Sequence, residues 1–204
     1  MSLTRFYRKI RYGKPIIIVS GLPRSGTSML MKILEAGGVE IATDGLRTAD
    51  DDNPKGYYEF EKIKDLDKNR DKSWVAELRG KAVKIVSYFL EKLPDDNNYK
   101  IIFIERNLQE VIASQNKMLV HRGEAVDDPA GDEKMIRNFE NHLSKVKYLL
   151  GHEPHFEALF VIHNMLLKSP DEQVKKICRF LGGHLDKKKM VDVVDPTLYR
   201  NRAK

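Results

Sequence analysis

The sequence predicts an α/β fold, in which a central, mostly parallel sheet is flanked by helices. Short runs of β-branched and other apolar residues alternate along the chain with longer segments whose apolar residues recur at helical spacing. The chain has 204 residues, 41% of them hydrophobic, which is enough to bury one full core. We therefore expect residues 1–204 to form a single domain, with a ligand at the carboxyl ends of the strands.

The first half of the chain begins with a predicted strand at residues 16–20, an unbroken β-branched run typical of a strand buried on both faces. A helical stripe of apolar residues follows and ends at Gly37-Gly38. A short strand is predicted at 39–42, and the turn-forming composition of 43–58 predicts a long loop, a kind of segment that is usually functional. A polar helix is predicted near 60–71.

The second half repeats the alternation of strand and helix. Strands are predicted at residues 82–86, 100–105 and 158–162. Helices are predicted at 108–120, at 133–150 with Asp132 as N-cap, from Ser169-Pro170 to Gly182-Gly183, and, as a short basic helix, near 186–194. A second loop is predicted at 121–131.

The loop between the first strand and the first helix says most about function. Gly21 and Gly26 bound a short turn, and Thr27 and Ser28 open the helix, which is the frame of a phosphate-binding P-loop. Glycines let backbone N–H groups approach an anion, and a helix N-terminus favours one. Thr27 stands where a nucleotide triphosphatase has Lys, and Arg24 supplies a cation inside the loop. These residues, 21–28, predict a site for a phosphate-like group, the alternative being a glycine turn with a surface arginine.

A second anion site is predicted at the same edge of the sheet. Arg106 follows the strand at 100–105, and Ser114 lies eight residues later, about two helical turns along the next helix. An arginine at a strand end and a serine in a helix are each commonplace. Their position beside the loop at residues 21–28 makes them candidates for a phosphate site.

Together these motifs resemble those of the sulfotransferases that use 3′-phosphoadenosine 5′-phosphosulfate (PAPS). In that family a loop of the form Pro-Lys/Arg-Ser-Gly-Thr-Thr/Ser grips the phosphosulfate, and this chain has Pro23-Arg24-Ser25-Gly26-Thr27-Ser28. A later strand of the family ends in Arg, with Ser eight positions on, to hold the 3′-phosphate, and Arg106 and Ser114 match. Weaker likenesses cover Lys84, Leu93-Pro94, the helix after Pro170, and residues 53–59 and 195–200.

The resemblance implies a three-layer, P-loop NTPase-like fold and sulfuryl transfer by in-line displacement. PAPS would be the donor and 3′-phosphoadenosine 5′-phosphate (PAP) the product, with no metal. The acceptor would be the hydroxyl or amine of a small molecule, glycan or lipid. The residues implied in holding the nucleotide are Arg24, Ser25, Gly26, Thr27, Ser28, Arg106 and Ser114.

The resemblance also implies catalytic residues. Arg24 would stabilise the charge that grows on the leaving phosphate. Lys84 is a second candidate cation, the alternative being a surface lysine at a strand end. Many members have Lys-Thr-His where this chain has Lys84-Ile85-Val86, and others use a glutamate as the base. Glu59 is the glutamate we expect to accept the proton of the acceptor, with Glu61 as its competitor.

Two departures from the family pattern concern the nucleoside. The Tyr-Glu-Asp segment that contacts adenine in the family is His163-Asn164-Met165 here. The Arg-Lys-Gly motif that clamps the 3′-phosphate is absent, and Arg200 and Arg202 are candidates to replace its charge. Trp74 and Tyr57 are candidates to stack on the adenine, although such residues more often belong to the core or rim.

Composition excludes several other classes of protein. The formal net charge is +6, which suits an anionic ligand, and without a zinc-finger or RNP-like motif we expect no nucleic-acid partner. The lone Cys178 excludes an internal disulfide and is predicted to be a small buried hydrophobe. No apolar run has the length of a membrane span, and no signal core follows the basic N-terminus, so we expect a cytoplasmic protein. Nothing in the sequence indicates an oligomeric state.

Two alternatives to a sulfotransferase share the predicted fold or the predicted anion site. A nucleotide or small-molecule kinase of the P-loop type would require magnesium and a lysine in the loop. A non-catalytic protein that binds a nucleotide or a nucleic acid would show no group transfer.

Overall fold

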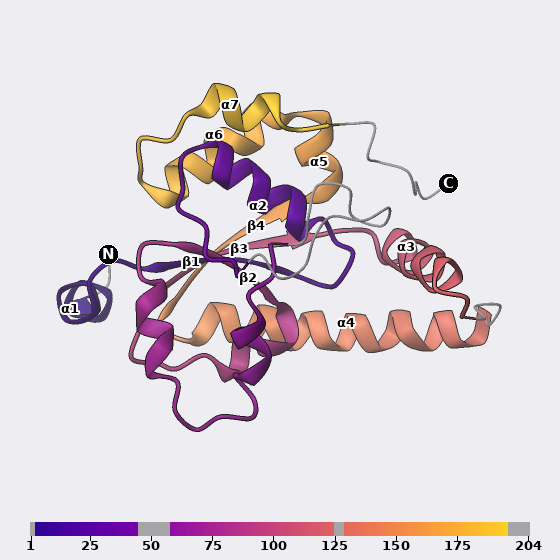
Figure 1. Cartoon of the computed structure of the whole chain (residues 1–204), viewed down its shortest axis with the longest axis horizontal. Helices are drawn as coiled ribbons and strands as arrows, with labels where there is room; N and C mark the ends of the chain where they lie inside the picture. The colour runs from indigo at the N-terminus through magenta and orange to yellow at the C-terminus, as the bar shows by residue number, and fades with distance from the viewer. Residues whose placement is uncertain (1–2, 45–57, 125–128, 196–204) are drawn as a thin grey trace.

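The computed structural model describes residues 3–44, 58–124 and 129–195, and within them four parallel strands form one sheet (Figure 1). β1 (Ile16–Gly21) lies between β2 (Ala82–Val86) and β3 (Tyr99–Glu105), and β4 (Phe156–Ile162) pairs with the other side of β3. All three pairings are parallel. The predicted α/β class and parallel sheet are confirmed.

Helices cover both faces of the sheet and give a three-layer arrangement (Figure 1). One face carries α2 (Thr27–Ala36), α5 (His163–Lys168), α6 (Pro170–Leu181) and α7 (Lys187–Asp192). The opposite face carries the long helix α4 (Pro129–His152), against which α3 (Leu108–His121) packs. The sheet is therefore buried between two layers of helices.

Alternate strand residues contribute to two separate cores. Ile18, Val83 and Phe103 belong to the core on the side of α4, whereas Val19 and Ile102 belong to the core beneath α2 and α6. All five side chains are fully buried. Burial on both faces accounts for the unbroken apolar sequence of the central strands.

The register of the strands brings three connecting segments to one edge of the sheet. Gly21, the last residue of β1, pairs with Val86 of β2 and with Ile104 of β3. The segments that follow these strands therefore leave the sheet at the same level. Residues 21–28, Ser87 and Arg106 all lie at this edge, as the sequence predicts for the loop and for Arg106.

Several predicted elements differ in the structure. The strand expected at residues 39–42 is reduced to one isolated bridge between Ile41 and Ala82. In place of the polar helix near 60–71 there is a short 3₁₀ helix, η1 (Glu61–Asp65), and a second one, η2 (Ser73–Leu78), follows. η1 buries Ile63, and Leu66 directly after it is also buried, but residues 67–72 add no apolar side chain that could extend an amphipathic helix along the core.

The boundaries of the later helices are partly as predicted. α4 begins at Pro129, so the prediction of Asp132 as its N-cap is wrong; Asp132 lies in the first turn and its carboxylate accepts from Asn116 Nδ2 at 3.0–3.1 Å. α6 ends at Gly182, whose φ of 71° is the left-handed conformation that glycine tolerates at a helix end. Two further helices are not predicted: α5, and η3 (Ser87–Lys92), which follows β2.

No helix is predicted before residue 16, yet α1 (Leu3–Tyr12) lies there, beside the end of the sheet where β1 begins (Figure 1). Phe6, Tyr7 and Ile10 of this helix are exposed and belong to none of the apolar cores. Among the described residues, no helix combines the length and the apolar composition needed to cross a bilayer.

Candidate active site

The loop between β1 and α2 has a backbone that requires its two glycines. A Cβ on Gly21 would lie 2.7 Å from the carbonyl oxygen of Ile104, and one on Gly26 would lie 2.7 Å from Cδ2 of His163. Gly26 also has a φ of 105° and occupies the N-cap position of α2. Gly26 has no side chain to accept from the first N–H groups of α2. In a P-loop, the N–H groups at this position bind an anion.

Ser25 and Arg24 hold the loop in its turn. The Ser25 hydroxyl donates to the carbonyl of Leu22 at 2.7 Å and its N–H donates to the same oxygen at 3.2 Å. Arg24 adopts the left-handed conformation, with a φ of 67°. A non-glycine residue in that conformation is strained, and such strain is concentrated at functional sites.

The two predicted anion motifs contact each other directly. Arg24 Nε donates to Oγ of Ser114 at 3.2 Å, and Arg106 Nη1 donates to the carbonyl of Arg24 at 3.2 Å. Ser114 is buried, and the Arg106 side chain is only 9% exposed. The structure thus brings together three of the residues that the sequence singles out, from the loop, from the end of β3 and from α3.

Arg106 also forms a buried ion pair that is not predicted from the sequence. Its Nε lies 3.0 Å from Oε2 of Glu110, one turn along α3, and the Glu110 side chain is 1% exposed. A carboxylate this deeply buried needs its cation, and the pair holds the guanidinium in place. The spacing of four residues in a helix is the signal that could have indicated the pair.

His163 packs against the loop from the end of β4. Its ring is buried and lies close to Gly26. Burial, and then the charge of Arg106, lowers the pKa of His163 from 6.5 to about 4, so the ring is neutral at neutral pH. Nδ1 of the ring lies 3.3 Å from Oδ1 of Asn164. The sequence shows that His163-Asn164-Met165 departs from the family pattern, but it does not predict that His163 contacts the loop.

Glu59 and Lys84 lie next to each other, beside the strand that leads into the loop. Glu59 Oε1 is 3.8 Å from Lys84 Nζ, and their side chains are 22% and 10% exposed. Lys84 pairs in register with Val19 of β1. Tyr58, with a φ of 51°, donates its hydroxyl to Glu35 of α2 at 2.6 Å and so fixes the start of this segment.

The competing carboxylate, Glu61, has a different partner. Its Oε1 lies 2.7 Å from Nζ of Lys64, and both side chains are well exposed. Only its backbone is tied to the preceding segment, since its N–H donates to Asp44. Of the two glutamates, Glu59 is therefore the one beside Lys84.

A hydrogen-bonded pair absent from the predictions lies at the end of β2. Oγ of Ser87, which is buried, is 2.8 Å from Nε2 of His142 in α4, and the His142 ring stacks on Tyr88 with centroids 3.8 Å apart. Burial lowers the pKa of His142. Ser87 directly follows Val86, the residue paired with Gly21, so the pair lies at the edge of the sheet that carries the P-loop. Because 55 residues separate Ser87 from His142, no sequence motif reveals it.

Trp74 does not lie where a nucleobase could stack on it. It is 9% exposed and belongs to the core on the side of α4, where its ring is 6.0 Å from that of Phe60. The other candidates for contacts with the nucleoside and the 3′-phosphate, Tyr57, Arg200 and Arg202, lie outside the described residues. Several segments that the sequence singles out also lie outside the described residues: 53–57 and 196–200 of the weaker likenesses, most of the loop at 43–58, and 125–128 of the second loop.

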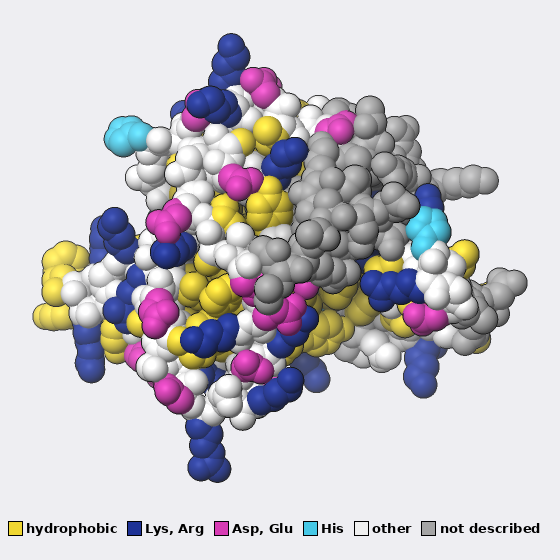
Figure 2. Space-filling view, in the orientation of Figure 1, with side chains coloured by type: hydrophobic (Ala, Val, Ile, Leu, Met, Phe, Trp, Pro, Cys, Tyr) yellow, Lys and Arg dark blue, Asp and Glu magenta, His cyan; other side chains and the backbone are white. Residues whose placement is uncertain are grey.

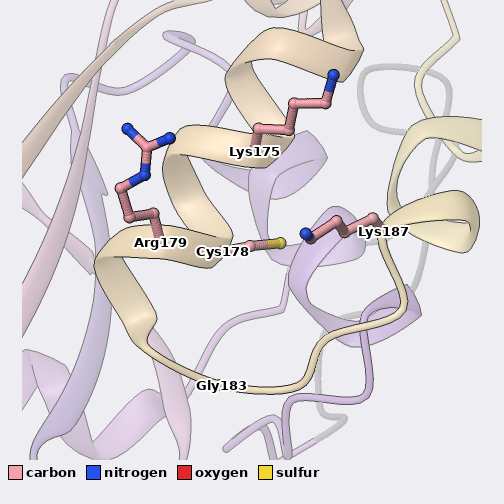
Figure 3. A pocket seen from close by; sticks show the side chains of 5 residues that line it. All are labelled: Lys175, Cys178, Arg179, Gly183 and Lys187. Carbon is pink, nitrogen blue, oxygen red and sulfur yellow. The ribbon is translucent and has the colours of Figure 1, made fainter.

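A pocket of about 360 Å³ on α6 and α7 contains none of the predicted site residues. Figure 3 shows Lys187 reaching toward the thiol of Cys178, while Lys175 and Arg179 point away from it. Cys178 is 5% exposed, as predicted for a small core residue, and burial raises its pKa. Among the described residues, no group of three His, Cys, Asp or Glu side chains is placed to hold a metal ion.

Comparison with known proteins identifies related folds. The family described as the sulfotransferase domain matches residues 14–202. Similar solved structures include a sulfotransferase from Alicyclobacillus acidocaldarius, with 18% identity over 83% of this chain and 81% of that chain and a TM-score of 0.52. Mouse sulfotransferase SULT7A1 complexed with PAP has 19% identity over 89% of this chain and 62% of that chain, with a TM-score of 0.54.

The sulfotransferase domain from the curacin biosynthetic pathway is a third similar structure, with 16% identity over 89% of this chain and 78% of that chain and a TM-score of 0.53. At these identities the similarity concerns the fold, and it confirms the predicted P-loop-like architecture. No curated protein matches the sequence significantly.

Proposed function

We propose that this chain, which belongs to the sulfotransferase family, transfers a sulfuryl group from PAPS to the hydroxyl or amine of an acceptor. Its family makes it an enzyme, and the donor and the roles of individual residues are our proposal. The observation that carries it is the direct contact between the two anion motifs, through the hydrogen bonds of Arg24 with Ser114 and of Arg106 with Arg24. PAPS has a phosphate at the 3′ position and a phosphosulfate at the 5′ position, so it needs two adjacent anion sites.

The residues at the edge of the sheet suit this nucleotide. The backbone N–H groups of Gly26 to Ser28 would hold the 5′-phosphosulfate. Ser25, whose N–H donates to Leu22, would shape the turn that presents them. Arg106 and Ser114 would hold the 3′-phosphate. Arg24 would stabilise the negative charge that develops on the leaving phosphate, an effect typically worth roughly 3 kcal/mol for a donor of this kind.

In the transfer step, an oxygen or nitrogen of the acceptor attacks sulfur in line with the bridging oxygen. A new bond to sulfur forms, the bond between sulfur and the bridging oxygen breaks, and its electron pair leaves on the 5′-phosphate of PAP. Glu59 would take the proton of the acceptor, and Lys84 would balance the charge of the transferred group. The distance of 3.8 Å between Glu59 Oε1 and Lys84 Nζ supports these paired roles.

The acceptor in this proposal is a small molecule, or a hydroxyl of a glycan or a lipid. The Ser87–His142 pair and Tyr88 lie near the P-loop on the side of α4, and Glu59 and Lys84 lie beside β1. An acceptor bound at this edge would meet these groups.

Ligand-dependent thermal stability tests the donor and separates it from a kinase substrate. A ligand that binds only the folded protein raises its melting temperature, and at equal ligand concentration the tighter ligand raises it more. We expect PAP without metal to stabilise the protein more than ATP with magnesium does, because Thr27 replaces the lysine of a triphosphatase loop. Greater stabilisation by ATP with magnesium would instead indicate a kinase.

A further inference from the structure

The N-terminal helix α1 exposes its apolar residues to solvent. Phe6, Tyr7 and Ile10 are 53%, 69% and 69% exposed, and their spacing of three and four residues places them on one face of the helix. Amphipathic helices of soluble proteins normally turn such a face toward the core. Figure 2 shows hydrophobic atoms gathered at the outer end of the molecule where Figure 1 places α1.

The polar face of α1 attaches it to the rest of the protein. Arg8 Nη2 donates to the carbonyl of Asp95 and, at 2.8 Å, to that of Asn97. Asn98 Nδ2 donates to the carbonyl of Arg8 at 3.0 Å, and the Arg8 guanidinium lies over the ring of Tyr12. The helix is thus held in an orientation that directs Phe6, Tyr7 and Ile10 outward.

The charged residues of α1 itself are all basic, although the exposed Asp95 and Asp96 lie near its Arg8 face. The sequence has no Asp or Glu before Glu35, while Arg5, Arg8, Lys9, Arg11 and Lys14 precede β1. Lys9 and Arg11 are exposed, like the apolar face between them. An exposed apolar face bordered by cations complements the surface of a bilayer that contains anionic lipids.

A second copy of the chain is a poorer match for this face. A symmetric pairing of two α1 helices would bring Lys9 and Arg11 of both copies together, and like charges at an interface disfavour association. We propose that α1 docks on the surface of an anionic membrane, with Phe6, Tyr7 and Ile10 in the interface and Lys9 and Arg11 against the headgroups.

The position of α1 leaves the candidate active site open during docking. α1 lies at the end of the sheet where β1 begins, whereas residues 21–28 and Arg106 lie where the strands end (Figure 1). Docking therefore places the protein at the membrane with its P-loop directed away from it. The proposal concerns where the protein binds and does not depend on the reaction.

Vesicle flotation tests the proposal. The full chain is mixed with phosphatidylcholine vesicles, with or without phosphatidylserine, and we expect it to float only with the anionic vesicles and to be released by salt. The double variant Phe6→Ser/Ile10→Ser should bind the anionic vesicles at least about tenfold more weakly than the parent. The charge variant Lys9→Gln/Arg11→Gln should show a loss of the same size. Tyr148→Ser, which changes an aromatic residue that is 67% exposed on α4, should bind like the parent.

Circular dichroism and the urea unfolding midpoint of each variant, measured alongside, show whether the variant is folded. The proposal is overturned if the parent does not float with anionic vesicles, or if folded α1 variants float as well as the parent does. It is also overturned if the parent forms a dimer that the same variants abolish and does not bind vesicles, since a second copy would then cover α1.

Discussion

The Arg106–Glu110 pair gives Arg106 a structural role in addition to its proposed contact with the nucleotide. Because both side chains are buried, Arg106→Ala should leave an uncompensated carboxylate and lower the free energy of unfolding by about 3–5 kcal/mol. The double variant Arg106→Met/Glu110→Leu removes both charges and should regain most of that stability. Urea denaturation of the two variants measures the difference, and equal losses would contradict a buried pair.

His163 makes the stability of the protein depend on pH. In the unfolded chain the ring binds a proton below its ordinary pKa of 6.5, but in the folded protein it does so only below about 4. Lowering the pH from 6.5 to 4 therefore favours the unfolded chain and should cost up to about 3 kcal/mol. His163→Asn should lose less stability than the parent over this interval in urea denaturation. Burial also lowers the pKa of His142 and His155, so part of the dependence of stability on pH should remain in His163→Asn.

If the free energy of unfolding changed equally with pH in His163→Asn and in the parent, His163 would not be the group responsible. A variant that is too unstable for comparison can be replaced by His163→Gln, which also removes the titrating ring.

Glu59 and Glu61 differ in one property that matters for the reaction, the proximity of Lys84. With an acceptor that the enzyme turns over, Glu59→Gln should keep PAP binding and lower turnover by roughly 10²–10⁴-fold, the usual contribution of a general base. Glu61→Gln, at a site paired with the exposed Lys64, should leave turnover unchanged. Unaltered turnover in Glu59→Gln would assign the base elsewhere, and His142→Asn would then be the variant to measure.

At the scale of elements, the junction of β1 with α2 depends on Gly26. Gly26→Ala forces a Cβ against His163 at a φ of 105° and should cost about 1–3 kcal/mol. Gly151→Ala is the matched control, because a Cβ in the last turn of α4 meets nothing within 4 Å and should leave the free energy of unfolding unchanged or slightly raised. Thermal or urea unfolding gives both values, and a neutral Gly26→Ala would contradict the described loop.

Sequence patterns predict an element well when the burial of its own residues determines it. The strand at 16–20 is an unbroken apolar run because both of its faces are covered, and α6 has Pro170 at its start and Gly182 at its end. By contrast, α1 has a helical apolar stripe that no core covers, and the segment after residue 60 has too few apolar positions for an α-helix. For α1 the deciding property, the lack of a covering core, lies outside the segment, whereas for the segment after residue 60 it lies in the segment's own composition.

The candidate site divides in the same way. Arg24, Arg106 and Ser114 can be predicted because backbone geometry at a strand end fixes the spacing of the motif. His163 and the Ser87–His142 pair come from distant parts of the chain and reach the edge only through the register of the parallel strands. Short motifs encode local geometry, whereas the walls of a site depend on the packing of the whole sheet.

At the scale of the whole molecule, the parallel sheet separates two proposed activities. Its carboxyl end carries the two anion motifs, and its amino end carries the basic helix α1 with an exposed apolar face (Figure 1). Removal of the membrane contact should therefore leave nucleotide binding intact. Variants of the anion site that remain folded should likewise still float with anionic vesicles.

In the proposed function, residues 21–28, Arg106 and Ser114 together bind one nucleotide at both of its phosphates. Calorimetric titration with PAP and with AMP, which lacks the 3′-phosphate, tests it most directly. We predict that PAP binds roughly 10–100-fold more tightly than AMP, since charge-assisted hydrogen bonds to the 3′-phosphate are lost in AMP. Ser114→Ala should narrow that ratio, and Ser144→Ala, on the exposed side of α4, should preserve it. No binding of millimolar PAP, or equal affinities for PAP and AMP, would contradict the account.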